Sequence, residues 1–234
     1  MERAGRAVPE DGIVLEGVGK RFGPARVLRK VDAAFPRGAV TLVTGGNGAG
    51  KSTLLKIMAG LSRPSAGRVV RARGADGGEA RIGYVGHATF LYPGLSALEN
   101  LAFWRTAHQL PLDREALLAL LARVGLDGRA HERARVFSRG MAQRLNLARV
   151  LMLAPDILLL DEPMTGLDAP SRDLLRREIA RARGAGACVA LVSHDLPGDG
   201  PLADRVLALA SGGVAYVGPA SDYFARAGEG PCCA

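Results

Sequence analysis

The stretch that most constrains this chain is Gly45–Thr53, which reads GGNGAGKST and matches G-x-x-x-x-G-K-[ST]. Glycines at this spacing let the backbone curl, so that successive N–H groups point at phosphate oxygens. Lys51 adds a positive charge for the β- and γ-phosphates, and the Ser52 hydroxyl is a ligand for Mg²⁺. The flanks fit, because residues 39–44 form an apolar run typical of a buried strand and residues 52–59 have helical spacing. The sequence therefore predicts a phosphate-binding loop and a helix whose N-terminus faces the phosphates.

An ordinary glycine-rich turn is the alternative, but it does not account for the strand, the Lys-Ser pair and the helix in this order. The loop alone predicts only nucleotide binding, and the motifs that follow narrow the expected ligand to ATP with Mg²⁺. The residues expected to contact the nucleotide here are Gly45, Gly46, Asn47, Gly48, Ala49, Gly50, Lys51, Ser52 and Thr53.

An acidic pair much later in the chain limits the reactions that the nucleotide site could carry out. Residues 157–160 are all apolar and are followed by Asp161 and Glu162. ATPases with this kind of loop hold Mg²⁺ through an Asp at the end of such a strand, so Ser52 and Asp161 are the expected metal ligands. Glu162 is placed to polarise the attacking water as a general base. The alternative is a solvated acidic loop after a buried strand.

Hydrophobic patterning and turn residues predict an alternating strand–helix order that a helical block interrupts. Ser96 with Glu99 has the spacing of a capping box, and Asp113 is a second expected helix cap. Strands are expected at residues 12–17, 27–35, 39–44, 68–72, 82–85, 157–160, 187–192, 206–210 and 214–217. Helices are expected at residues 52–59, 96–109, 114–124, 141–153 and 171–183.

These elements predict one α/β domain over residues 1–234. Its nucleotide-binding core, which includes an N-terminal antiparallel β-subdomain, is expected at residues 12–88 and 155–225. The helical block at residues 89–154 is expected to be an inserted α-helical subdomain.

The net charge of +8 raises the question of an acidic partner. The arginines are scattered, and only 5% of residues are aromatic, so there are few side chains for stacking on bases. We therefore expect no nucleic acid partner, and interpret the charge as a compositional bias with some attraction to a membrane surface.

Cysteine usage favours a reducing compartment, the cytoplasm, because the three cysteines form no disulfide framework and no zinc spacing. Cys188 lies in an apolar run and is expected in the core. We assign no role to the adjacent Cys232 and Cys233.

Residues 1–11 are charged and do not predict a signal peptide. The richest apolar stretch, residues 150–160, is interrupted by Pro155 and Asp156 and is shorter than the ~20 residues of a membrane span, so we expect membrane work to proceed through a partner.

With these motifs in this order, the chain resembles the nucleotide-binding subunit of an ATP-binding cassette (ABC) transporter over nearly its whole length. The resemblance implies that residues 45–52 are the Walker A loop and that Glu162 ends the Walker B strand as the catalytic base. It implies that residues 165–168 are the D-loop with Asp168, and that His194 is the switch histidine at the γ-phosphate. Phe22 stands where the family keeps an aromatic that stacks on adenine. A lone Phe or His would more often be a core or loop residue.

The ABC signature motif departs from the usual L-S-G-G-Q and reads Phe-Ser-Arg-Gly-Met at residues 137–141. Ser138 and Gly140 are kept, which retains a hydroxyl and a helix N-terminus for the γ-phosphate. The resemblance implies that both contact ATP bound to a second nucleotide-binding subunit, so that a homodimer encloses two ATP molecules.

His87 is a second departure, because most relatives carry the Q-loop Gln there, which touches Mg²⁺ and couples to the membrane partner. Through His87, the Tyr-Val-Gly that precedes it and the run at residues 95–104, the chain resembles the haem exporter ATPases of cytochrome c maturation, the CcmA subfamily. This implies integral membrane partners resembling CcmB and CcmC, and a peripheral location at the cytoplasmic face of the inner membrane.

Three alternatives stay open. One is the ATPase subunit of a drug, lipid or polysaccharide exporter, since those proteins share part of the run at residues 95–104. Another is a soluble ABC ATPase acting on nucleic acid or ribosomes, which the charge suggests, although such proteins commonly carry two cassettes or long insertions. The last is a nucleotide switch without hydrolysis, which Glu162 disfavours.

Overall fold

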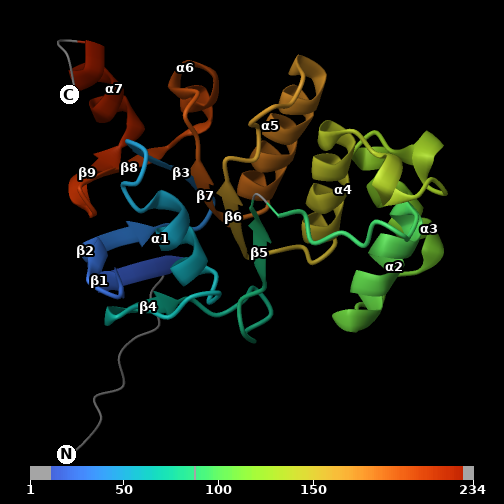
Figure 1. Cartoon of the computed structure of the whole chain (residues 1–234), viewed down its shortest axis with the longest axis horizontal. Coiled ribbons are helices and arrows are strands. Elements are labelled where there is room, and N and C mark those ends of the chain that lie inside the picture. The colour runs from blue at the N-terminus through green and yellow to red at the C-terminus, as the bar shows by residue number, and fades with distance from the viewer. Residues whose placement is uncertain (1–11, 87, 229–234) are drawn as a thin grey trace, which may run out of the picture.

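The computed structural model describes residues 12–86 and 88–228, and a six-stranded sheet lies at its centre (Figure 1). In spatial order its strands are β5 (Ile82–Val85), β6 (Ile157–Asp161), β7 (Cys188–Val192), β3 (Ala39–Gly45), β8 (Arg205–Ala210) and β9 (Gly213–Pro219). The first five are parallel, and β9 pairs with β8 antiparallel, as the predicted closing hairpin requires. The central strands β6 and β7 are buried along their whole length, which is typical of a parallel sheet covered on both faces.

A smaller antiparallel sheet comes from the first part of the chain. Its strands, in spatial order, are β2 (Ala25–Phe35), β1 (Ile13–Phe22) and β4 (Ala66–Arg71). Strand β1 runs on to Phe22, beyond the predicted end at residue 17. An irregularity in the pairing at Gly17, which has a φ of 58°, allows the strand to continue, and pairing resumes at Val18.

Helices cover both faces of the large sheet, and the alternation of side chains along the strands sorts the core into two clusters. The covering helices are α1 (Lys51–Met58), α4 (Arg139–Leu151) and α5 (Ala169–Gly184). Ile157 and Leu159 of β6 belong to the cluster that contains α1 and the antiparallel sheet, whereas Leu158 and Leu160 belong to the cluster that contains α4 and α5. Helix α1 therefore lies between the two sheets, and α4 lies on the opposite face of the large sheet.

A block of helices joins β5 to β6 (Figure 1). It contains α2 (Ala97–Ala107), α3 (Arg114–Arg123), the 3-10 turns Asp127–Arg129 and Ala134–Val136, and α4. Both predicted caps are confirmed. Ser96 and Glu99 form a reciprocal capping box at the start of α2, and the Asp113 carboxylate accepts a hydrogen bond from Ala116 N at the start of α3.

Three short helical elements after β7 were not predicted from the sequence. Helix α6 (Leu196–Asp199) and a 3-10 turn (Gly200–Leu202) follow β7, and α7 (Ala220–Gly228) follows β9. Cys188 is fully buried, as predicted, whereas Cys232 and Cys233 lie outside the described residues. Among the residues described, no helix combines the length and apolar character needed to cross a bilayer.

The α/β class with an antiparallel sheet and an inserted helical block confirms the fold that the sequence predicted. The domain boundaries placed at residues 88/89 and 154/155 stay predictions.

Candidate functional site

The glycine-rich loop connects β3 to α1, and two of its glycines admit no other residue without rearrangement. Gly45 has a φ of 141°, and a Cβ there would lie 2.3 Å from the Leu209 carbonyl oxygen. Gly50 has a φ of 100°, and its Cβ would lie 2.6 Å from Leu28 Cδ2. Gly50 precedes the helix and offers no side-chain acceptor to the first-turn N–H groups of α1. Those donors are the ones an anion at the helix N-terminus uses.

Lys51 is held across this loop. Its Nζ donates to the carbonyl oxygens of Gly45 at 2.8 Å and Gly46 at 3.0 Å, and the side chain is buried. Residues 46–48 are exposed at the tip of the loop, whereas Ala49 is buried beneath it and Thr53 is partly buried in α1. The ammonium group therefore lies beside the exposed backbone of the loop, where a phosphate would be bound.

Ser52 and Asp161 meet at the C-terminal edge of the parallel sheet. The Ser52 hydroxyl donates to Asp161 Oδ1 at 2.9 Å, and the Asp161 side chain is almost completely buried. Adjacent ligands of an octahedral Mg²⁺ with bonds of about 2.0–2.1 Å are separated by about 2.9 Å, so this oxygen pair fits the metal. In the described part of the chain no group of three or more His, Cys, Asp or Glu residues is placed to hold a metal ion. The remaining ligands would therefore be phosphate oxygens and water, as Mg²⁺ prefers.

Tyr84 is a neighbour of this pair that the sequence did not single out as a site residue. Its hydroxyl donates to Asp161 Oδ2 at 3.3 Å. Burial, followed by the nearby Asp161 carboxylate, raises the pKa of Tyr84 well above its usual value, so the phenol stays protonated as a donor. The alignment of β5 beside β6 brings the two side chains together, and this is a tertiary contact without a local sequence signal.

Glu162 and His194 form a second pair at the same edge. Glu162 Oε1 lies 2.9 Å from His194 Nε2, and the Glu162 N–H donates to the Val192 carbonyl at 3.1 Å. Glu162 has a φ of 52°, a left-handed conformation that is uncommon outside glycine. Such conformations cluster at functional sites, where the surrounding structure holds them in place. The pair that the sequence predicted separately is thus in direct contact, after the ends of neighbouring strands β6 and β7.

A buried hydrogen-bond chain holds the loop that carries His194. The Ser193 hydroxyl donates to Asp199 Oδ2 at 2.6 Å and accepts from Asp195 N at 3.0 Å. Arg176 of α5 donates to Asp199 Oδ1 through Nη2 at 3.0 Å and Nε at 3.2 Å, and this bond raises the pKa of Arg176. Asp199 is almost fully buried. Sequence reasoning missed Asp199 and Arg176, because neither belongs to a motif.

Asp168 performs a local task in the structure: its Oδ1 accepts from Ser171 N at 3.0 Å and caps α5. These hydrogen bonds from Ser171 lower the pKa of Asp168. A cavity of about 200 Å³ lies between Glu162, His194 and the residues 163–167. The predicted D-loop therefore borders the space next to the predicted base.

The residues predicted to form the signature motif lie away from the phosphate loop. Ser138 caps α4, since its Oγ accepts from Met141 N at 3.2 Å, and the helix therefore begins at Arg139 and not at the predicted residue 141. Ser138 is exposed and Gly140 partly so. Because α4 and α1 belong to opposite faces of the large sheet, the structure does not bring Ser138 and Gly140 to the phosphate loop of their own chain (Figure 1).

Arg139, which departs from the usual signature, lies against Gly166 of the predicted D-loop of its own chain. A Cβ built on Gly166 would lie 3.1 Å from Arg139 Nη1. Phe22 is 55% exposed at the end of β1, with Lys20 Nζ 4.8 Å from its ring centre. His87 lies outside the described residues.

A phosphate loop that opens a helix, beside a strand ending in Asp-Glu, defines a P-loop nucleotide-binding protein. Residues 28–165 match the family model described as ABC transporter, which is more than half of the chain. This chain belongs to the ABC transporter family.

Two relatives of this chain are named as import ATP-binding proteins. The chain is 38% identical over 220 residues to the aliphatic sulfonates import ATP-binding protein SsuB 1 of Burkholderia lata, covering 93% of this chain and 67% of the relative. It is 39% identical over 216 residues to the molybdenum import ATP-binding protein ModC of Mycobacterium tuberculosis, covering 83% and 58%. A solved ATP binding subunit of an ABC transporter superposes with a TM-score of 0.81 at 27% identity, covering 92% and 93%. The chain thus spans about two thirds of the length of the first relative, and the narrower expectation of a haem exporter finds no support in these names.

We predict that replacing Asp199 by Asn destabilises the fold and disorders the His194 loop, because Arg176 then loses its buried carboxylate. The free energy of unfolding should fall by about 1–3 kcal/mol in denaturant titration. Asp173→Asn is the matched control, since Asp173 pairs with the same arginine but is largely exposed; it should change stability by less than about 0.5 kcal/mol. Equal stability of the two variants would contradict the role assigned to Asp199.

Proposed function

We propose that this chain hydrolyses ATP as the energising subunit of a membrane transporter, and that it acts as a dimer. The observation that carries the proposal is the meeting of two pairs, Ser52 with Asp161 and Glu162 with His194, at one edge of the sheet beside the phosphate loop. A protein that only bound nucleotide would not need the second pair.

Each residue has a task that follows from its position. The loop N–H groups and Lys51 bind the phosphates, and Phe22 supplies an exposed ring for the adenine. Bound Mg²⁺, held by Ser52 and Asp161, would offset negative charge on the phosphates. Glu162 accepts a proton from water, and His194, hydrogen-bonded to Glu162, fixes the orientation of that carboxylate and reaches towards the γ-phosphate.

Half of the site is missing from a single chain, because Ser138 and Gly140 lie away from the phosphate loop. We infer that a second copy supplies them. In a two-fold dimer each signature helix would face the loop of its partner, and both sites would be completed at once. The N-terminus of α4, with its cap on Ser138, would then approach the γ-phosphate of the partner's ATP.

The docking surface for the membrane subunits is proposed at three exposed aromatic side chains, two in the segment between β5 and α2 and one in α2. Phe90, Tyr92 and Phe103 are each more than two fifths exposed, and the Tyr92 and Phe103 rings pack edge to face at 4.4 Å. Exposed aromatics in a cluster mark protein contacts more often than free surface. Through this surface the chain would associate peripherally with the cytoplasmic face of the membrane.

Import is the direction that we favour, because the sulfonate and molybdenum relatives are named as import proteins. Haem export with partners resembling CcmB and CcmC is the second candidate, and it rests on the Gly-His at residues 86–87 and the run at residues 95–104. Measuring ATP hydrolysis by the complex that co-purifies with the chain distinguishes them. Hydrolysis by an importer would be stimulated only when a substrate-loaded binding protein is added, whereas hydrolysis by a haem exporter would not require one.

We expect Glu162→Gln to keep ATP affinity and lose turnover, because the amide cannot accept the proton. The hydrolysis rate measured by phosphate release should fall by about 10²–10⁴-fold. Glu115→Gln, on the exposed side of α3, makes the same chemical change away from the site and should retain the rate. A Glu162→Gln protein with a normal rate would refute the assignment of the base.

Mixing two inactive variants tests the dimer. Lys51→Ala removes the phosphate ligand but keeps the signature, and Ser138→Ala does the reverse, so a mixed dimer contains one complete site. An equal mixture should recover about a quarter of the wild-type rate, because half of randomly formed dimers are mixed and each has one of two sites intact. A mixture as inactive as its components would show that the signature does not act on the partner's ATP.

A further inference from the structure

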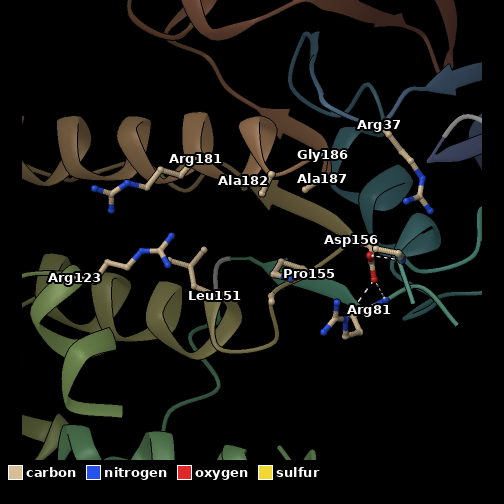
Figure 2. A pocket seen from close by; sticks show the side chains of 13 residues that line it. Arg37, Arg81, Arg123, Leu151, Pro155, Asp156, Arg181, Ala182, Gly186 and Ala187 are labelled. Atoms are coloured by element: carbon tan, nitrogen blue, oxygen red, sulfur yellow. Dashed lines mark hydrogen bonds and ion pairs between the residues drawn. The ribbon is translucent and has the colours of Figure 1, made fainter. Parts of the chain in front are cut away.

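A second cavity, of about 480 Å³, lies at the opposite edge of the parallel sheet, where the strands begin (Figure 2). Arg81, Asp156 and Ala187 stand directly before strands β5, β6 and β7 and line it. Asp161 and His194, in contrast, stand at the other ends of β6 and β7. The cavity is therefore separate from the nucleotide site, and none of the motifs found in the sequence falls on it.

Arginine is concentrated at this cavity. Four of its thirteen lining residues are arginines, whereas lysine and arginine together make up 31 of the 234 residues of the chain. Figure 2 shows them in two groups, Arg123 with Arg181 on one side and Arg37 with Arg81 on the other. A general arginine bias of the sequence does not account for such a gathering in one hollow.

Each pair of arginines contacts one carboxylate, so each pair keeps one positive charge in excess. Arg123 Nε and Arg181 Nη1 both bind the buried Glu178, at 2.7 and 2.6 Å. In the second group Asp156 is the acid, and Arg37 forms no ion pair with any acid among the residues described; its guanidinium donates to the Arg73 carbonyl.

Asp156 is already bound by the backbone, so it neutralises Arg81 incompletely. Its carboxylate accepts from Ala75 N at 3.0 Å and Arg81 N at 2.9 Å, whereas Arg81 Nε is more distant at 3.4 Å. Burial alone would raise the pKa of Asp156, but these backbone donors and the guanidinium lower it below its usual value. The Arg81 side chain remains 45% exposed and free to bind a further anion.

Helix ends provide a simpler reason for part of the cluster. Arg123 and Arg181 lie in the last turns of α3 and α5, where cations offset the partial negative charge of the helix C-terminus. Arg37 precedes β3 and Arg81 precedes β5, so the helix ends do not account for them. Offsetting the helix ends also does not require all four guanidinium groups to border one hollow.

The floor between the two groups is apolar. Leu151, Pro155, Ala182 and Ala187 lie there, and Figure 2 shows Leu151 and Pro155 between the two pairs of arginines. A cavity of about 300–1,000 Å³ with an apolar lining and a few charged groups is typical of sites for small molecules. Guanidinium groups bind carboxylates and phosphates with two parallel hydrogen bonds, which makes acid groups the natural ligands.

We propose that this cavity binds a small organic dianion of the dicarboxylate type, with one acid group at each pair of arginines and an aliphatic segment over the apolar floor. The bound molecule would touch α3 of the helical block and the first residues of the sheet at the same time. It would therefore join the two parts of the fold at the edge opposite the nucleotide site.

Isothermal titration calorimetry of the full chain with the aliphatic dicarboxylates from succinate to pimelate tests this proposal. We expect saturable one-to-one binding with an optimum at one chain length, and weaker binding of the monocarboxylate of equal length. Arg37→Gln and Arg81→Gln should each weaken binding by at least tenfold, since each removes a charge from the same end. Arg37 has no acidic partner, so its replacement leaves no buried charge unpaired, and a melting curve verifies that the variant folds.

Arg177→Gln is the control, because Arg177 is exposed on α5 and does not line the cavity; binding should be unchanged. The proposal is overturned if no dicarboxylate binds saturably at millimolar concentration, if the monocarboxylate binds equally well, or if Arg37→Gln and Arg177→Gln have the same effect. None of these readouts depends on ATP hydrolysis, so the result is independent of the function proposed above.

Discussion

The hydrogen bond between Ser52 and Asp161 joins positions that are 109 residues apart, and the organisation of the site depends on it. In the sheet, β7 lies between β3 and β6, so the phosphate loop and the acidic strand are not neighbours in the ladder. Helix α1 bridges the gap, because it packs on the sheet face formed by Leu159 and its neighbours and thereby carries Ser52 to the end of β6. The helical block enters the chain between β5 and β6 without disturbing this meeting, since β5 still pairs with β6.

The same sheet separates two kinds of surface. At the ends of the strands, glycines with positive φ, an unusual backbone at Glu162 and a buried Asp161 gather oxygen ligands and N–H donors. At the beginnings of the strands, arginines gather around an apolar floor. A phosphate site with Mg²⁺ suits the first edge, because that edge provides both oxygen ligands for a cation and N–H donors for phosphate. An organic anion suits the second edge, because its four arginines outnumber the two carboxylates, Asp156 and Glu178, that they contact.

Local signals predicted much of the fold. The loop at residues 45–53, the capping box at Ser96 and the cap at Asp113 each lie within a few residues of what they stabilise, and the structure has them as predicted. The pairing of Glu162 with His194 required two motifs that follow neighbouring strands, and the motifs alone did not reveal that they are in contact.

What the sequence did not predict is tertiary in origin. Tyr84 reaches Asp161 only because β5 lies beside β6, and Asp199 becomes important only because Ser193 and Arg176 converge on it from two elements. Helix α7 was not predicted, although a Gly-Pro pair at residues 218–219 precedes it and Gly228 ends it. Local sequence did not identify the subfamily either. His87 and the run at residues 95–104 suggested haem export, whereas the two relatives reported above are named as import proteins.

We propose that Ser52 and Asp161 jointly hold the Mg²⁺ of bound ATP, and calorimetric titration of ATP with and without Mg²⁺ tests this most directly. In the unaltered chain Mg²⁺ should strengthen ATP binding, and Asp161→Asn should abolish that strengthening while binding of metal-free ATP persists. If Asp161→Asn retains the full effect of Mg²⁺ on ATP affinity, the metal is held elsewhere and the account of the site is wrong.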